Sequence, residues 1–153
     1  MISKIISGGQ TGADRAALDY AIQYSIPYSG WVPKGRKSED GTVPEAYRLQ
    51  EMPTSDYSQR TEKNVLDSDG TLIVSHGILT GGSAVTEFYA EQHDKPCLHI
   101  DLDKVPPAEA AVFVRAWIDE HSIGVLNVAG PRAGKDPEIY SATFKLLEAL
   151  FKK

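Results

Sequence analysis

The chain has 153 residues, enough to bury one substantial core but not two. A composition of 41% hydrophobic and 24% charged residues is ordinary for a globular protein and excludes a disordered or fibrous chain. The formal net charge of -5 argues against a broad nucleic-acid-binding face, so any anion site must be local. We therefore expect a single domain over residues 1–153.

The N-terminal stretch MISKIISGG lacks the apolar segment and cleavage site of a signal peptide. No run reaches the roughly 18 apolar residues that a membrane span needs. These features predict a cytoplasmic protein that binds neither membranes nor nucleic acids. Cys97 is the only cysteine, which excludes an intramolecular disulfide, and its place in the apolar run CLHIDL favours a buried, unreactive thiol.

Short apolar runs alternate with helical patterns along the first half of the chain, which predicts βαβ units. A strand at KIIS leads through glycines into a helix that ends before Pro27, with Ala17, Leu18, Ala21 and Ile22 on its apolar face. A strand at YSGWV follows. The stretch 33–60 is charged, contains prolines and shows little periodicity, so we expect it to be a long binding loop.

The second half continues the alternation of helices and strands. A helix starting near Ser58 precedes the strand GTLIVS, a helix over 83–93 precedes CLHIDL, and a helix over 107–121 precedes GVLNVA. The last helix is expected to start at Asp136 as N-cap. The residues expected on the inner faces of these four helices are Val65 and Leu66; Val85, Phe88, Tyr89 and Gln92; Ala111, Val114, Ala116, Trp117 and Ile118; and Phe144, Leu147, Leu150 and Phe151.

Together these elements predict an α/β protein with a Rossmann-like three-layer α/β/α sandwich and a mainly parallel sheet of about five strands. The simplest order is second, first, third, fourth, fifth strand, which places a crevice between the first and third strands. The loops SGGQTGAD and SHGILTGGSAVTE follow those two strands, and AGPRAGKDP brings the fifth strand's loop to the same edge.

Helix starts flanked by glycine predict a site for phosphate or another oxyanion, because the backbone is accessible and its first N–H groups are unpaired. The stretch GGQTGADR has no Lys-Ser/Thr after its last glycine, so it is not a Walker motif. A dinucleotide dehydrogenase also fits poorly. The ribose-binding acid expected about 20 residues after the glycines is missing from VPKGRK.

Several candidates keep two interpretations. Thr11 and Asp14 have capping-box spacing, so Asp14 either caps the helix or contacts the ligand. The basic run around Lys34 and Arg36 is either solvated or binds an anion. Glu87 is either a general base in the crevice or an exposed helix residue.

Five blocks, SGGQTGADRAALDYA, GWVPKGRKSEDG, SDYSQRTEKNVLDSDGTLIVS, LTGGSAVT and NVAGPRAGKDPEIY, occur in order over nearly the whole chain. Together they resemble the molybdenum cofactor carrier-like family, a circularly permuted branch of the SLOG/lysine-decarboxylase-like Rossmann superfamily. The resemblance implies a carrier or store for the molybdenum cofactor (molybdopterin), with molybdoenzymes as receiving partners. The metal would come with this phosphorylated pterin, so no protein-ligated metal is expected.

The resemblance also implies roles for the candidate residues. Helix starts at Gly12 or Ser83 would bind the phosphate, and Gln10 and Asp14 would pair with the pterin edge. Basic side chains from the loops would face the oxo groups. The full set of candidate binding residues is Gly8, Gly9, Gln10, Thr11, Gly12, Asp14, Arg15, Lys34, Gly35, Arg36, His76, Gly81, Gly82, Ser83, Thr86, Arg132 and Lys135.

The alternative is an enzyme that processes a nucleotide or ADP-ribose, of N-glycosidase or hydrolase type, with Glu87 or Asp14 as acid or base; a nucleotide-sensing module is a further option. In the relatives with a PGGxGTxxE motif, a catalytic Arg and Glu join the phosphate loop. Here Ala84 stands in place of the glycine in the second half of that motif and no upstream Arg partner is evident, so the carrier is favoured. Phe113 and Trp117 could pair subunits, and the resemblance implies a homo-oligomer, dimer or tetramer.

Overall fold

The computed structural model describes residues 1–152. Its central sheet has five strands, and every pair of neighbours is parallel. In spatial order the strands are β2 (Tyr28–Ser29), β1 (Lys4–Ile6), β9 (Val125–Ala129), β7 (Gly70–Ser75) and β8 (Cys97–Asp101). All five carboxyl ends therefore meet at one edge of the sheet.

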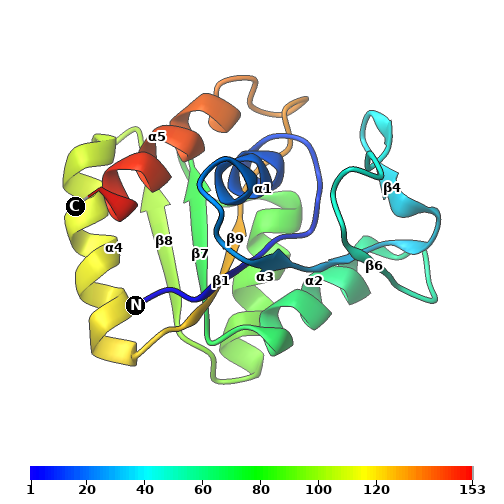
Figure 1. Cartoon of the computed structure of the whole chain (residues 1–153), viewed down its shortest axis with the longest axis horizontal. Helices are drawn as coiled ribbons and strands as arrows, with labels where there is room; N and C mark the ends of the chain where they lie inside the picture. Colours follow the sequence, from blue (N-terminus) through cyan, green and yellow to red (C-terminus); the bar gives the residue numbers. More distant parts are fainter. Residues whose placement is uncertain (153) are drawn as a thin grey trace.

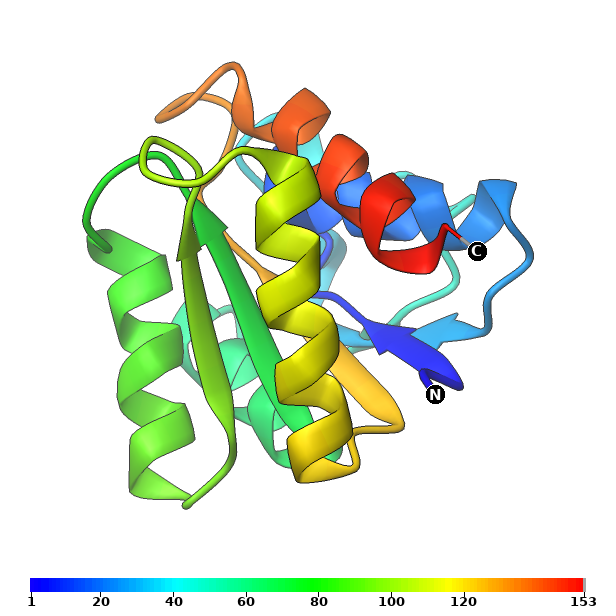
Figure 2. The same cartoon turned by 90° about the vertical axis from the view of Figure 1, so that its left-hand side faces the viewer.

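Helices cover both faces of the sheet (Figures 1 and 2). On one face α5 (Ile139–Phe151) packs against both α1 (Ala13–Gln23) and α4 (Pro107–His121). On the other, α2 (Tyr57–Asp67) packs against α3 (Gly81–Gln92). The Rossmann-like three-layer architecture expected from the sequence is confirmed.

The expected strand order was wrong in one respect: β9, the last strand in the chain, lies between β1 and β7. The central place suits its sequence, because Leu126, Asn127 and Val128 are all buried and the strand is covered on both faces. By contrast β8, with the polar residues His99 and Asp101, forms an edge. The chain leaves β9 toward the α1 face and β7 toward the α3 face, so the crevice lies between these two neighbours.

Several helix faces and one helix start also differ from expectation. Ile22 on α1 is 47% exposed, Phe88 on α3 is 59% exposed, and Trp117 on α4 is buried whereas Phe113 is exposed. The side chains of α3 that face inward are instead Ser83, Thr86 and Ala90, small groups that let the helix lie close to the sheet. Three further residues expected on inner faces, Leu66, Gln92 and Ala116, are exposed as well.

The start of the last helix was also placed too early. Asp136 is not its N-cap, because α5 begins three residues later and Glu138 occupies that position. The carboxylate of Asp136 accepts the backbone N–H of Glu138 at 3.0 Å instead.

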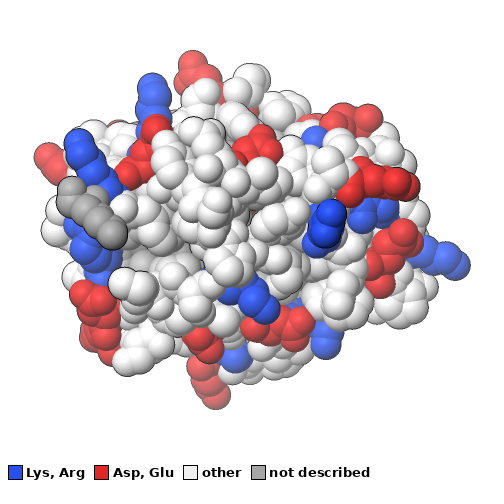
Figure 3. Space-filling view, viewed as in Figure 1, with Lys and Arg blue, Asp and Glu red and all other residues white. Residues whose placement is uncertain are grey.

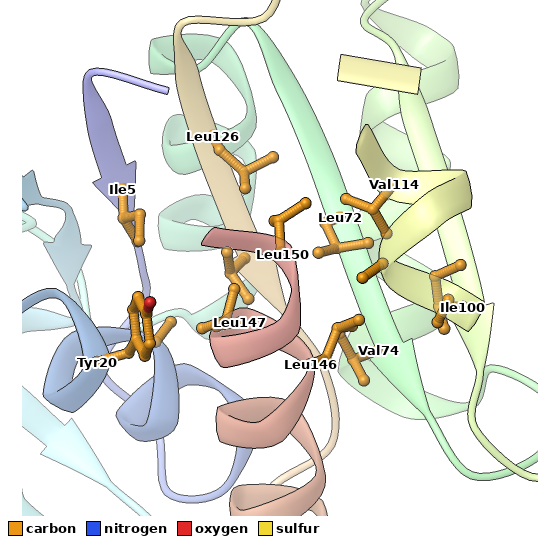
Figure 4. Close-up of a cluster of buried hydrophobic side chains, with 14 of the residues drawn as sticks. Ile5, Tyr20, Leu72, Val74, Ile100, Val114, Leu126, Leu146, Leu147 and Leu150 are labelled. Carbon is orange, nitrogen blue, oxygen red and sulfur yellow. The ribbon is translucent and has the colours of Figure 1, made fainter. Parts of the chain in front are cut away.

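The main apolar core lies between the sheet and the face formed by α1, α4 and α5 (Figure 4). Ile5, Leu72 and Leu126 project from three different strands toward Leu146 and Leu147 of α5, and all five are fully buried. Each such side chain contributes about 1.5 to 3 kcal/mol by leaving water. This core fixes the strands whose ends carry the loops.

The stretch expected to be a long binding loop has local structure of its own. It contains β3 (Trp31–Val32) paired with β6 (Gln50–Glu51), and β4 (Lys37–Ser38) paired with β5 (Gly41–Thr42), joined by a short 3-10 turn, η1 (Lys34–Arg36). These elements lie beside the main sheet, on the right in Figure 1.

Acidic and basic side chains are interspersed over the face shown in Figure 3, around an uncharged central area. Among the described helices, none is both long and apolar enough to cross a membrane.

The close approach between the start of α1 and the loop after β9 predicts a specific cost of substitution. Gly12 has φ 83° and ψ -127°, and a Cβ there would lie 2.4 Å from the Pro131 carbonyl oxygen. Gly35 also has a positive φ, of 80°, but a Cβ there would meet nothing within 4 Å. We expect Gly12→Ala to lower the free energy of unfolding by about 3 kcal/mol or more, and Gly35→Ala by about 1 kcal/mol.

Urea unfolding of the two variants measures this difference. Gly35→Ala controls for backbone strain, since it has the unfavourable φ without the clash. Equal losses in the two variants would show that the contact between the loops does not limit residue 12.

Candidate functional site

A cavity of about 390 Å³ opens at the carboxyl ends of β1, β9 and β7. It is lined by the loop after β1, the start of α3, the end of β9 with its loop, and the inner face of α2. The lining residues are Gly8, Gln10 and Asp14; Thr80, Gly82, Ser83, Val85 and Thr86; Asn127 to Arg132 and Lys135; and Asp56, Tyr57, Ser58, Arg60, Thr61 and Asn64.

A buried pair of opposite charges forms one wall of this cavity. Arg60 Nη1 lies 4.0 Å from Asp14 Oδ2, and each side chain is only about a tenth exposed. Asp14 Oδ2 also accepts the backbone N–H of Gln10 at 3.2 Å. Burial raises the pKa of the Asp14 carboxyl to about 6, although the charge of Arg60 and the Gln10 N–H act in the opposite direction.

Arg60 is held by the glycine loop. Its Nη1 donates to the carbonyl oxygen of Gly8, and a Cβ on Gly8 would come within 2.3 Å of the same nitrogen. Its Nε is buried and has no hydrogen-bond partner among residues 1–152. An unpaired buried donor of a charged group is costly, so a ligand atom that accepts from Arg60 would stabilise the site.

The start of α3 provides unpaired backbone N–H groups. Thr80 is its N-cap residue, and within the described chain no side chain caps this end. The ammonium of Lys135 reaches the same place, because a Cβ on Gly81 would come within 2.9 Å of Lys135 Nζ. Arg132 also lines the cavity, although its Nε donates to Glu39 at 2.8 Å. Helix start and ammonium together favour an anion.

Other candidates near α1 lie outside the cavity and hold loops together. Thr11 Oγ1 donates to Glu39 Oε2 at 2.5 Å and accepts the Ala133 N–H at 3.0 Å. Arg15 donates to the Gly9 carbonyl and forms an ion pair with Asp40 at 3.0 Å. Asp14 does not act as a capping-box residue for α1, since Gly12 is the N-cap and no side chain caps that start.

The basic candidates of the 33–60 stretch do not line the cavity either. Arg36 donates to the backbone carbonyls of Val43, Pro44 and Tyr47 at 2.8 to 2.9 Å. Lys34 and Gly35 are exposed at the η1 turn beside it. Arg36 therefore stabilises the fold of its own loop.

His76 lies in a second cavity, of about 460 Å³, next to the first. Its Nδ1 lies 2.6 Å from Asp136 Oδ2. Glu87 lines neither cavity; its charge, with that of Glu91, adds to burial in raising the pKa of the Cys97 thiol to about 12. Among residues 1–152, no three His, Cys, Asp or Glu side chains are grouped so that they could hold a metal ion.

Comparison with known proteins identifies the family of this chain. The sequence model of the circularly permutated YpsA SLOG family matches residues 5–151. The chain belongs to this family. It is also 72% identical to a protein of Syntrophus aciditrophicus SB named putative molybdenum carrier protein, whose crystal structure superposes with a TM-score of 0.97. The match covers 98% of this chain and 95% of that one. Among curated proteins, none matches the chain.

Sequence reasoning missed the contribution of α2 to the site of this SLOG protein. Tyr57, Ser58, Arg60 and Asn64 all line the cavity, yet the sequence placed only Val65 and Leu66 inside. The sequence did contain one signal for this contribution: Arg60 and Asn64 are four residues apart and so share one helix face. Arg60 precedes the start of α3 in the chain, but its partner is Asp14 and not Glu87.

The raised pKa of Asp14 predicts how its replacement acts on stability. An aspartate titrates near 3.8 when unfolded and near 6 here, so the folded state binds the proton more tightly. The contribution of the Asp14 carboxyl to the free energy of unfolding is fully present below about pH 4 and is lost as pH rises through about 6. We expect Asp14→Asn to gain stability relative to the wild type as pH rises across this window.

Urea unfolding between about pH 4 and pH 7 measures the difference. Asp40→Asn is the matched control, because hydrogen bonds from Arg15 and Ser38 lower the pKa of Asp40 to about 2. The stability that Asp40 contributes is lost only as pH falls through about 2, so it stays constant across the measured window. A constant difference for Asp14→Asn would contradict the titration assigned to Asp14.

Proposed function

We propose that this protein is a carrier or store for a phosphorylated heterocycle, most specifically the molybdenum cofactor, bound in the cavity between β9 and β7. The observation that carries the proposal is that one cavity joins a buried carboxylate, Asp14, to the uncapped start of α3 beside Lys135. The carboxylate suits a heterocycle with N–H donors, and the helix start suits a phosphate.

The heterocycle end is defined by Asp14 and Gln10. Gln10 Oε1 accepts the Glu39 N–H at 2.8 Å, which leaves its amide nitrogen to donate. A carboxylate that accepts and an amide that donates complement an aminopyrimidinone edge, which presents an amino group, a ring N–H and a carbonyl oxygen. A pterin carries this edge, and guanine carries the same one. Tyr57 offers an aromatic ring to the same cavity.

The phosphate end is defined by the backbone of Gly82 and Ser83 and by the ammonium of Lys135. Gly82 has open space where a Cβ would be, so a phosphate can approach the first N–H groups of α3. The molybdenum cofactor fits these donors: its phosphate would lie at α3, and its metal-bound oxo groups would face Arg132 or Lys135. The cofactor itself supplies the dithiolene that holds the metal.

The relative named a putative molybdenum carrier protein supports this reading through its 72% identity over nearly the whole chain. A second candidate function, hydrolysis of a nucleotide, is favoured by one observation. Asp14, with its pKa raised to about 6, lies in the cavity and suits an acid or base, whereas Glu87 lies outside. Turnover of guanosine monophosphate or ADP-ribose that Asp14→Asn abolishes would favour the enzyme.

The test of the carrier uses the small molecules that copurify with the protein. We expect protein from molybdenum-replete cells, once oxidised and denatured, to release a fluorescent phosphorylated pterin at near one equivalent per chain. Gly82→Ala should lower this yield at least several-fold, because the methyl group occupies the path of the phosphate. The same change should stabilise the fold by about 0.5 kcal/mol, since alanine favours the helix.

A matched pair of lysine variants controls for charge. Lys135→Gln should lower the pterin yield, whereas Lys34→Gln, which removes an equal charge outside the cavity, should not. A released guanine nucleotide in place of pterin would keep the phosphate site but contradict the molybdenum cofactor. Protein that releases neither would contradict the carrier.

A further inference from the structure

The second cavity adjoins the first, because four residues line both: Thr80, Ser83, Pro131 and Lys135. These four lie at the start of α3 and in the loop after β9, where the proposed phosphate would bind. A ligand whose phosphate lies at this junction therefore has space on both sides. The two cavities are of similar size, about 390 and about 460 Å³, and each is large enough for a group the size of a nucleoside.

Three carboxylates contribute to the polar lining of the second cavity, together with the hydroxyls of Ser75, Thr80 and Ser83. Asp103, Asp136 and Glu138 contribute carboxylates from the loops after β8 and β9. The contact of 2.6 Å between Asp136 and His76 Nδ1 fixes the imidazole ring, and Nε2 has no partner among the described residues. Because Nδ1 is occupied by Asp136, Nε2 is the nitrogen left to bond to a ligand.

The remaining lining is apolar. Leu79 and Leu102 lie on the walls, and Ile78 contributes a side chain that is 84% exposed. Carboxylates repel a further phosphate but accept hydrogen bonds from hydroxyl groups, and exposed apolar side chains cover a flat ring. The second cavity therefore suits a polyhydroxylated group that carries a ring.

We propose that the second cavity binds the second half of a two-part ligand, in which a sugar-bearing group such as a nucleoside is joined through phosphate to the heterocycle in the first cavity. This rests on the proposed function, and it specifies the ligand class as dinucleotide-like. The linking phosphates lie at Ser83 and Lys135, and the hydroxyls of the second half bond to Asp103 and to His76 Nε2. His76 is a positioning residue held by Asp136.

The experiment compares guanosine diphosphate with diguanosine diphosphate by titration calorimetry on the intact chain. Both probes carry the aminopyrimidinone edge and two phosphates. Diguanosine diphosphate adds the second nucleoside, whose ester bond removes one negative charge from the terminal phosphate, so tighter binding cannot come from added charge at an anion site. We expect the wild type to bind diguanosine diphosphate at least tenfold more tightly. His76→Gln should lower that affinity about fivefold and leave the affinity for guanosine diphosphate unchanged.

A variant that fills the second cavity tests whether the tighter binding of diguanosine diphosphate arises there. Asp103 lines only the second cavity, so Asp103→Trp should bring the ratio of the two affinities near one without weakening guanosine diphosphate. Asp119→Trp, on an exposed residue of α4, is the matched control and should leave both affinities unchanged. Leu79→Trp repeats the test from the loop after β7 if Asp103→Trp does not fold.

The outcomes distinguish failure of the second subsite from failure of the proposed function of the first cavity. Equal affinities for the two probes in the wild type would overturn the second subsite and leave the first cavity's function intact. A full affinity ratio in both Asp103→Trp and Leu79→Trp would also overturn it. Failure of both probes to bind would overturn the heterocycle site together with its extension.

Discussion

The contact between the start of α1 and the loop after β9 is the constraint on which the rest of the site depends. The Ala13 N–H donates to the Pro131 carbonyl at 3.3 Å, next to a glycine that cannot carry a side chain. Glu39 then bonds to both loops, accepting from Thr11 and from the Gly134 N–H at 2.9 Å. The distance between the proposed heterocycle and phosphate ends follows from this contact, since Asp14 and Lys135 belong to the two loops it joins.

The buried pair of Asp14 and Arg60 has a different role from such structural contacts. Removing two charges from water costs several kcal/mol, and a pair at 4.0 Å offsets this only in part, which is why the pKa of Asp14 is raised. The unpartnered Nε of Arg60 points to the same conclusion. A structure selected only for stability would replace such a pair with apolar groups, so its presence in a cavity favours a ligand that completes the hydrogen bonding.

How far the sequence predicted this arrangement depended on the range of the interactions involved. The glycine-flanked helix starts and the parallel strands follow from local patterns, so Gly8, Gln10, Asp14 and Ser83 were correctly expected to approach one another. The position of β9 in the sheet was not predicted, because it depends on which strand is covered on both faces. That is a property of the whole fold. Arg36 looked like an anion ligand because no local pattern shows that it donates to carbonyls up to 13 residues away. Arg60 and Asn64 were missed because a polar pair on a helix face is ordinarily exposed.

Because the overall charge is -5, the selectivity of an anion site must come from the groups close to it. Figure 3 shows both signs interspersed over one face, and the net negative charge provides no long-range attraction for an anion. Within the cavity the charges are ordered instead: Asp14 and Arg60 compensate each other, and Glu39 compensates Arg132. Lys135 has the helix start as its neighbour, and the second cavity behind it is rich in carboxylates. These charges therefore favour a phosphate at the junction of the two cavities. The proposed heterocycle would then lie in the first cavity, and the proposed sugar-bearing group would lie among the carboxylates of the second.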